Sequence, residues 1–188
     1  MRKVVMSQFV SLDGVVEDPG GVEGYQYGGW AFRFGSTEQQ QVKIDELFQA
    51  NTLLLGRRTY EGFAAVWPTM QGTGAYGERM NSLPKYIAST TLTEMTWNAT
   101  PLTGDLAEAI SKLKQEEGQD ILIFGSIQLV QTLHNLRLID EYRLMVFPLI
   151  LGRSRRLFSD TSEMQALQLV ENKLLPSGVL TLTYHPTK

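Results

Sequence analysis

The sequence predicts an α/β protein in which helices flank a mostly parallel β-sheet. Short apolar runs rich in β-branched residues alternate along the chain with amphipathic stretches of helical spacing, which is typical of strands joined by crossover helices. After residue 140 this alternation stops. Two strand-like segments then follow each other with only Pro176-Ser177-Gly178 between them, which predicts a C-terminal antiparallel hairpin.

The N-terminal part of the chain predicts a strand, a long loop and a helix. Val4–Ser11 is apolar and rich in β-branched residues, as expected of a buried strand. The glycine-rich segment Asp13–Trp30 is expected to be a loop, and loops of this length in compact domains are often functional. A helix follows, because Ser36 and Gln39 have the spacing of a capping box. Its expected buried stripe is formed by Ile44, Leu47 and Phe48.

The middle of the chain continues the alternation. We expect strands over residues 52–55, 85–90 and 120–126, and helices over residues 59–66, 75–83 and 127–136. A further helix begins after Asp105, because Glu108 follows three residues later. A long strand run over residues 140–152 is interrupted by Pro148, which favours an edge, bend or bulge there. The hairpin strands lie over 167–175 and 179–186, and the second is expected to have one buried and one polar face.

Length and composition limit the function. The 188 residues are expected to form one domain over 1–188, with ordinary fractions of hydrophobic (43%) and charged (20%) residues. The net charge of −3 gives the protein no general attraction to nucleic acid or anionic membrane. The chain has no cysteine, no segment long enough to span a bilayer and two histidines far apart, so disulfides, a membrane and a metal site are not expected. We expect a cytoplasmic protein.

Three strand ends carry residues that suit an anionic ligand. Gly56-Arg57-Arg58-Thr59 begins after one strand, residues 88–91 (Ala-Ser-Thr-Thr) follow the next, and Phe124-Gly125-Ser126 ends a third. Glycine at a helix N-terminus lets a phosphate approach free N–H groups, and arginine donates two hydrogen bonds to it. Each turn also has a simpler explanation: glycine for backbone geometry, arginines in solvent, and serine or threonine as turn formers.

The segments "SLDG", "LLLGRRTYEGF", "KYIAST", "ILIFGSIQLVQTL" and "DEYRLMVFPLILGRSRRLF", in this order, resemble the dihydrofolate reductase-like superfamily. Within it, they resemble the branch that contains the C-terminal domain of the bacterial riboflavin-biosynthesis deaminase–reductase. The resemblance covers roughly Lys3–Tyr184. It implies a three-layer fold with a central mostly parallel sheet. It also implies hydride transfer from NADPH to a pterin-like or ribosylaminopyrimidine-like substrate.

The resemblance also assigns residues to the cofactor. It implies that the first turn, with Gly56, Arg57 and Thr59, meets the adenosine phosphate side of NADPH. The second turn, with Ser89 and Thr90, is implied to approach the adenosine ribose phosphate. The third turn, with Gly125 and Ser126, is implied to meet the pyrophosphate. Arg57 is expected to contact the phosphate and Arg58 to point elsewhere. The family has a second glycine where this chain has Ser126, whose hydroxyl could instead cap the helix and donate to the phosphate.

On the substrate side, the resemblance places Asp13 near the nicotinamide. Asp13 could orient substrate or relay a proton, although an Asx turn is at least as good an explanation. Trp30 and Phe34 are candidates for stacking on a flat ring, with core packing as the alternative. Residues 25–37 contain no Asp or Glu, so the substrate-binding acid of dihydrofolate reductases has no equivalent there. We therefore expect little activity on dihydrofolate.

The expected function is an NADPH-dependent reductase acting on a small heteroaromatic substrate. The alternatives are a non-catalytic nucleotide-binding or regulatory protein on the same fold and a purely structural dimerisation domain. A homodimer is expected, because Leu144–Leu151 is more apolar than an outer strand needs. The alternative explanation is that this strand is buried within its own monomer.

Overall fold

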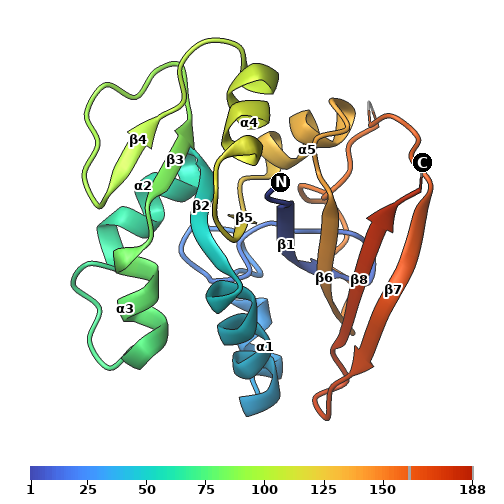
Figure 1. The fold of residues 1–188 in the computed structure, drawn as a ribbon. Coiled ribbons are helices and arrows are strands. Elements are labelled where there is room, and N and C mark those ends of the chain that lie inside the picture. The colour runs from blue at the N-terminus through green and yellow to red at the C-terminus, as the bar shows by residue number, and fades with distance from the viewer. Residues whose placement is uncertain (161, 188) are drawn as a thin grey trace.

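The computed structural model describes residues 1–160 and 162–187. Their eight strands form a single sheet with the order β4-β3-β2-β5-β1-β6-β8-β7 (Figure 1). The strands are β1 (Val4–Ser11), β2 (Ala50–Gly56), β3 (Lys85–Ala88), β4 (Ala99–Pro101), β5 (Asp120–Phe124), β6 (Glu141–Phe147), β7 (Leu167–Leu174) and β8 (Leu180–Pro186). The helices are α1 (Thr37–Phe48), α2 (Arg57–Val66), α3 (Gly74–Ser82), α4 (Leu106–Gln115) and α5 (Ile127–Asn135), with a 3-10 turn, η1, over Trp30–Phe34.

The pairing of the strands confirms the predicted fold class. Strands β1 to β6 are joined by parallel pairs, and β8 runs antiparallel to both β6 and β7. The hairpin turn is closed by hydrogen bonds between Leu175 and Val179 and between Gly178 and Leu175. The short strand β4 was not expected from the sequence, because it is three residues long and pairs only with β3.

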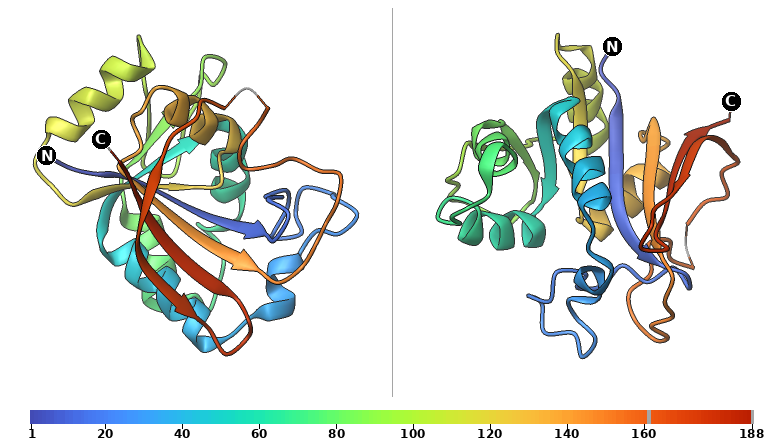
Figure 2. Two further views of the ribbon diagram at one scale, coloured as in Figure 1. Left: turned by 90° about the vertical axis from the view of Figure 1, so that its right-hand side faces the viewer. Right: turned by 90° about the horizontal axis from the view of Figure 1, so that it is seen from below.

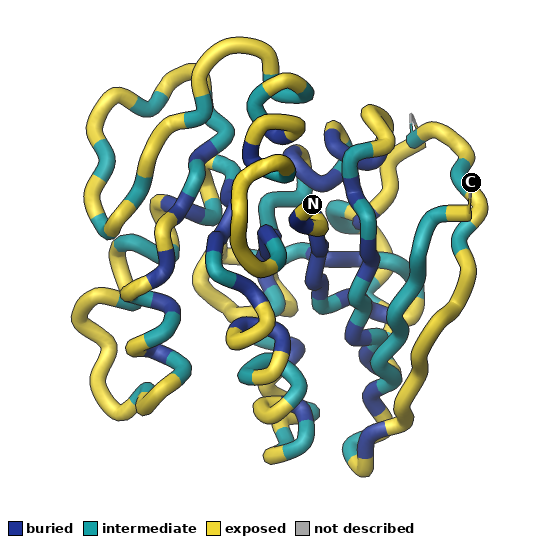
Figure 3. The backbone as a smooth tube through the Cα atoms, viewed as in Figure 1, coloured by how far each residue is buried: buried dark blue, intermediate teal, exposed yellow. Residues whose placement is uncertain are grey.

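Helices cover both faces of the sheet, which gives three layers (Figure 2). On one face, α4 and α5 pack against alternate residues of β1 and β5, with Ile110 and Val130 fully buried. On the other face, α1, α2 and α3 pack through Leu47, Tyr60 and Met80. Burial is densest along the central strands, and the outer hairpin strand β7 is exposed over most of its length (Figure 3).

Two local predictions are corrected by the structure, and a third is narrowed. Phe48 was expected on the buried stripe of α1 but is 45% exposed, and Glu46 lies buried on the inner face instead. β6 is an interior strand between β1 and β8 that ends at Phe147, and the chain bends at Pro148, which is one of the three options that the sequence left open. Strand β8 is half-buried at every residue, so its leucine and threonine positions do not form the expected buried and polar faces.

Candidate functional site

The sheet reverses its winding direction between β5 and β1. After β1, the strands β2, β3 and β4 form on one side of it, and β5 then fills the position between β2 and β1 (Figure 1). From β5 the chain crosses to β6 on the opposite side of β1. In open α/β sheets, ligands bind in the crevice outside the carboxyl ends of the strands at this kind of switch point. A ligand-binding site is therefore expected at the carboxyl ends of β1, β2 and β5.

The turns after β2 and β5 are hydrogen-bonded to each other there. The amide of Gly56 donates to Ser126 Oγ at 2.9 Å, and the amide of Ser126 donates to Thr59 Oγ1 at 2.9 Å. Gly125 has a φ of +52°, and a Cβ at this position would lie 3.1 Å from Thr59 Oγ1. The structure thus brings together four of the predicted cofactor residues. Each hydroxyl accepts one of these bonds, so its own hydrogen is left to donate to a ligand.

The two helices that begin at these turns differ from α1 and α4, whereas α3 shares with them the lack of a side-chain cap and of a first-turn acid. α1 and α4 have side-chain caps, Ser36 and Asp105, and each has an acidic residue in its first turn. α2 and α5 begin at Gly56 and Ser126 without a side-chain cap and without an acid in the first turn. The Ser126 hydroxyl therefore does not cap α5, contrary to the option raised by the sequence. Two uncapped helix N-termini lie side by side, and this arrangement suits a phosphate group.

The remaining cofactor candidates lie at the next strand end. Arg57 Nη1 is 3.6 Å from Glu61 Oε1, and both side chains are about half exposed, so this ion pair holds the arginine only weakly. Arg58 is exposed. Gly56 pairs with Ala88 in register, which places Ser89 beside the start of α2. The Ser89 hydroxyl accepts the amides of Thr91 and Leu92, so it forms a turn, while Thr90 is exposed.

Asp13 connects the end of β1 to the loop after β6. Its carboxylate accepts hydrogen bonds from Ser11 Oγ at 2.6 Å, from the Leu151 amide at 3.1 Å and from the Gly152 amide at 2.8 Å. Burial raises the pKa of Asp13, but these three bonds outweigh it and hold the pKa below its ordinary value. This geometry suits a carboxylate that positions two loops at the edge of the crevice.

The aromatic candidates of the first loop pack on the protein itself. Trp30 is 1% exposed, and its Nε1 donates to the carbonyl of Glu17 at 2.8 Å. The ring of Phe147 meets Trp30 edge-on at 5.1 Å and Phe34 at 5.8 Å. The structure therefore places Trp30 in the core, which is the alternative left open by the sequence, whereas Phe34 is half-buried beside it.

The loop that carries Trp30 is held by buried and paired charges. The carboxylate of Asp18, which is 1% exposed, accepts the amides of Val22, Glu23 and Tyr25. Arg155 then ties the loop to the segment after β6 through ion pairs with Glu17 at 3.0 Å and Glu23 at 2.7 Å. The length and glycine content of the loop gave no sign of this internal order.

A cluster of polar residues that sequence reasoning missed lies beside the carboxyl end of β5, on the α1 side of the sheet. Lys43 Nζ is 2.5 Å from Glu46 Oε2 and also donates to Ser7 Oγ, and Ser7 Oγ donates to Glu46 at 2.7 Å. The lysine ammonium lies 4.6 Å from the ring centroid of Phe124 and 5.1 Å from that of Phe9. The signal that could have found this cluster is the i, i+3 charge pair on the inner face of α1.

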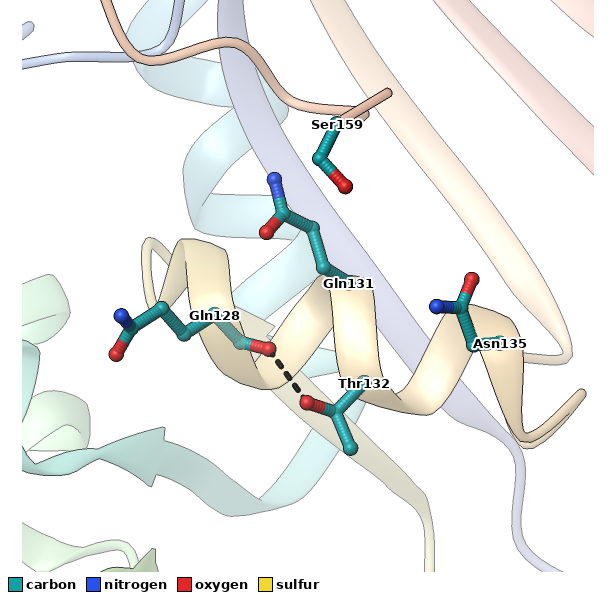
Figure 4. Close-up of a pocket in the computed structure, with 5 residues that line it drawn as sticks. All are labelled: Gln128, Gln131, Thr132, Asn135 and Ser159. Carbon is teal, nitrogen blue, oxygen red and sulfur yellow. Dashed lines mark hydrogen bonds between the residues drawn. The ribbon is translucent and has the colours of Figure 1, made fainter. Parts of the chain in front are cut away.

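A hollow in the described residues lies away from this cluster and from the strand ends. It has a volume of about 450 Å³ and is formed by the outer side of α5 and the segment at Ser159 (Figure 4). Polar side chains line it, and none of the predicted cofactor or substrate residues takes part. In the same described part of the chain, no group of three or more acidic or histidine side chains is arranged to hold a metal ion. No helix there is long and apolar enough to cross a bilayer.

The comparisons with known proteins identify the family. A model of the RibD C-terminal domain family matches residues 2–181. The chain belongs to this family. The protein YyaP of Bacillus subtilis is 29% identical to this RibD-type chain over 187 residues, which are 98% of this chain and 95% of YyaP.

Solved structures show the same fold. A crystal structure from Shewanella sp. PV-4, described as that of a candidate riboflavin biosynthesis protein, has a TM-score of 0.78 at 20% identity and covers 99% of both chains. Dihydrofolate reductase from Enterococcus faecalis, complexed with NADP(H), has a TM-score of 0.61 at 12% identity and covers 99% of this chain and 97% of that one. The RibD-like chain therefore has the dihydrofolate reductase-like fold that its sequence predicted.

Proposed function

We propose that this protein is an NADPH-dependent reductase of a small heteroaromatic substrate of the pterin or ribosylaminopyrimidine kind. Such a reaction would resemble the reduction of 5-amino-6-(5-phosphoribosylamino)uracil in riboflavin biosynthesis. The observation that carries the proposal is the pair of uncapped helix N-termini joined by the hydrogen bonds among Gly56, Thr59 and Ser126. Membership of the RibD C-terminal domain family supports it.

The residues present fit a dinucleotide phosphate. Gly125 is at a position where a Cβ would press on Thr59, so glycine lets this turn lie close against the start of α2. The hydroxyls of Thr59 and Ser126 can each donate one hydrogen bond, and Arg57 can turn away from its exposed partner Glu61 toward a 2′-phosphate. When bound, NADPH would supply the hydride. The chain's own task would be to hold the cofactor and substrate in register and to exclude water.

The experiment is a fluorescence titration with NADPH and NADH. We expect tighter binding of NADPH, because a charged hydrogen bond to the 2′-phosphate contributes roughly 1.5–3 kcal/mol, or about ten- to a hundredfold in affinity. Arg57→Ala should remove most of this preference. Arg58→Ala is the matched control, since it removes an adjacent exposed arginine of the same helix turn. Equal affinity of the unmodified protein for both nucleotides would contradict the assignment.

A non-catalytic nucleotide-binding protein on the same fold is the second candidate. It is favoured by the lack of an evident proton donor, since the three hydrogen bonds to the Asp13 carboxylate keep it ionised. Stopped-flow measurement of NADPH oxidation against a panel of pterins and aminopyrimidines separates the two. Tight NADPH binding without oxidation by any member of the panel would favour the non-catalytic protein.

A further inference from the structure

We propose that Lys43 is a specificity residue that hydrogen-bonds to a ring oxygen of the substrate, and that Glu46 and Ser7 position it. The inference rests on the proposed function, because it assumes that the crevice takes a flat heterocycle. It goes further by naming the substrate edge that the protein recognises: a carbonyl oxygen of a lactam-type ring, as opposed to an amino group at the same position.

The position of the cluster is the first argument. Ser7 pairs in register with Phe124, the residue that precedes Gly125 at the end of β5. The Lys43 ammonium lies 4.6 Å from the Phe124 ring. The cluster therefore lies between the middle of β1 and the carboxyl end of β5, next to the phosphate turn and at the switch point of the sheet.

The second argument is the cost of burying these charges. The side chains of Lys43 and Glu46 are only 14% and 8% exposed. A buried ion pair gives little net stability, and apolar side chains of similar volume often hold two elements together as well or better. Packing α1 on the sheet therefore does not by itself require a lysine and a glutamate at these positions. Charged groups buried at the switch point of an α/β sheet, where such folds bind ligands, are candidates for a role in binding.

The third argument is the hydrogen-bonding capacity of the ammonium. Lys43 has three N–H donors, and two of them are directed to Glu46 and Ser7. The third remains for a ligand that lies against Phe9 and Phe124, whose rings flank the ammonium. Such a donor selects an oxygen acceptor, because an amino group at the same position would place its own N–H donor against the N–H donor of Lys43.

Another polar group lies on the same face of α1, one turn nearer the N-terminus. Gln39 is 8% exposed, and among the described residues its Oε1 has no hydrogen-bond partner although it is buried. Buried acceptors without a partner are rare in folded proteins. Gln39 thus offers an acceptor, and Lys43, four residues later, offers a donor. This pair fits a ligand edge that has both a ring N–H and a carbonyl.

The test compares two pteridines that differ at the recognised edge. Lumazine (pteridine-2,4-dione) presents ring oxygens and N–H groups, whereas 2,4-diaminopteridine presents amino groups at the same carbons. We expect the unmodified protein, measured with saturating NADPH and without it, to bind lumazine at least tenfold more tightly. Lys43→Met should abolish this preference, and Lys43→Arg should retain part of it.

Two further variants guard against a purely structural effect. Lys43→Met leaves Glu46 without its partner and can destabilise the fold, so the double variant Lys43→Met with Glu46→Leu removes both charges together. Lys114→Met is the matched control, because the Lys114 side chain is 12% exposed and ion-paired with Asp140, but it lies on α4 on the opposite face. It should keep the lumazine preference.

The outcomes separate this inference from the proposed function. Failure to bind NADPH would reject the proposed function, and a lumazine preference lost only in the Lys43 variants would still support the inference. Equal binding of the two pteridines, no measurable binding of either, or a preference unchanged in both the single and the double variant would overturn the inference while leaving NADPH binding as it stands.

Discussion

Gly125 offers the sharpest test of the phosphate turn, because the chain contains a control with the same backbone. Gly125 has a φ of +52°, and a Cβ there would lie 3.1 Å from Thr59 Oγ1 and 3.3 Å from Thr59 Cγ2. Gly74, at the start of α3, has a φ of +53°, and a Cβ there would have no atom within 4 Å. Alanine at either position meets the same unfavourable positive φ, but only at Gly125 does it press on Thr59.

The expected magnitudes follow from these contacts. A non-glycine residue in the left-handed region costs about 1–2 kcal/mol, so Gly74→Ala should lower the free energy of unfolding by that amount. In Gly125→Ala the Thr59 hydroxyl must also move away from the amide of Ser126, which it now accepts at 2.9 Å. Loss of that bond adds about 1 kcal/mol, which brings the expected loss for Gly125→Ala to about 2–3 kcal/mol.

Urea unfolding of the two single variants measures the difference, and repeating both in a Thr59→Ala background isolates its cause. Without the Thr59 side chain, Gly125→Ala should cost no more than Gly74→Ala. NADPH affinity gives a second measurement, and it should fall for Gly125→Ala but not for Gly74→Ala. Equal destabilisation by the two alanines in the unmodified background would refute the idea that Gly125 is required by its contact with Thr59.

Three further predictions concern stability, assembly and substrate range. Burial lowers the pKa of Lys85 from 10.5 to about 8, so between these pH values the unfolded state binds more protons than the folded state. The unfolding free energy of the unmodified protein should therefore rise from pH 8 to 10 relative to that of Lys85→Met. A difference that stays constant over this pH range would contradict the prediction. Light scattering of the unmodified protein should give twice the 21.1 kDa monomer mass. Leu169→Lys, on the exposed edge strand β7, should give monomers. A monomer mass for the unmodified protein would reject the dimer. Turnover of dihydrofolate with NADPH should be far slower than an ordinary enzymatic rate on the order of 10 per second, because residues 25–37 contain no acid to protonate the pterin. Glu38 follows this segment directly, but hydrogen bonds from its own amide and from Ser36 lower its pKa.

The fold was predictable because each of its main elements is encoded locally. β1 has the predicted bounds, and Ser36 and Asp105 cap α1 and α4 as their capping-box spacing indicated. The interior position of β6 was not predictable from its own residues. An apolar strand has the same sequence pattern whether a partner subunit or the hairpin strand β8 covers it, and only the pairing decides between them.

The cofactor turns were predictable as a set, but their mutual contacts were not. Glycine after a strand indicates a turn at Gly56 and at Gly125, yet the residues that join the two turns are about 70 positions apart in sequence. Ser126 illustrates the difference. Local chemistry favours serine as a helix cap, whereas in the structure its hydroxyl accepts a hydrogen bond from the amide of Gly56 and makes no capping bond to α5.

The polar cluster of α1 was missed for a reason that makes it informative. Apolar residues at spacings of three and four indicate a buried helix face, and in this helix they are Ile44, Leu47 and Phe48. The face that is buried contains Gln39, Lys43 and Glu46 beside Leu47, at helical spacing but with polar side chains. Packing alone would favour apolar residues at those positions, so the polar residues there conflict with the local pattern of a buried helix face. Such conflicts are expected where a protein binds a ligand, and this one lies at the switch point of the sheet.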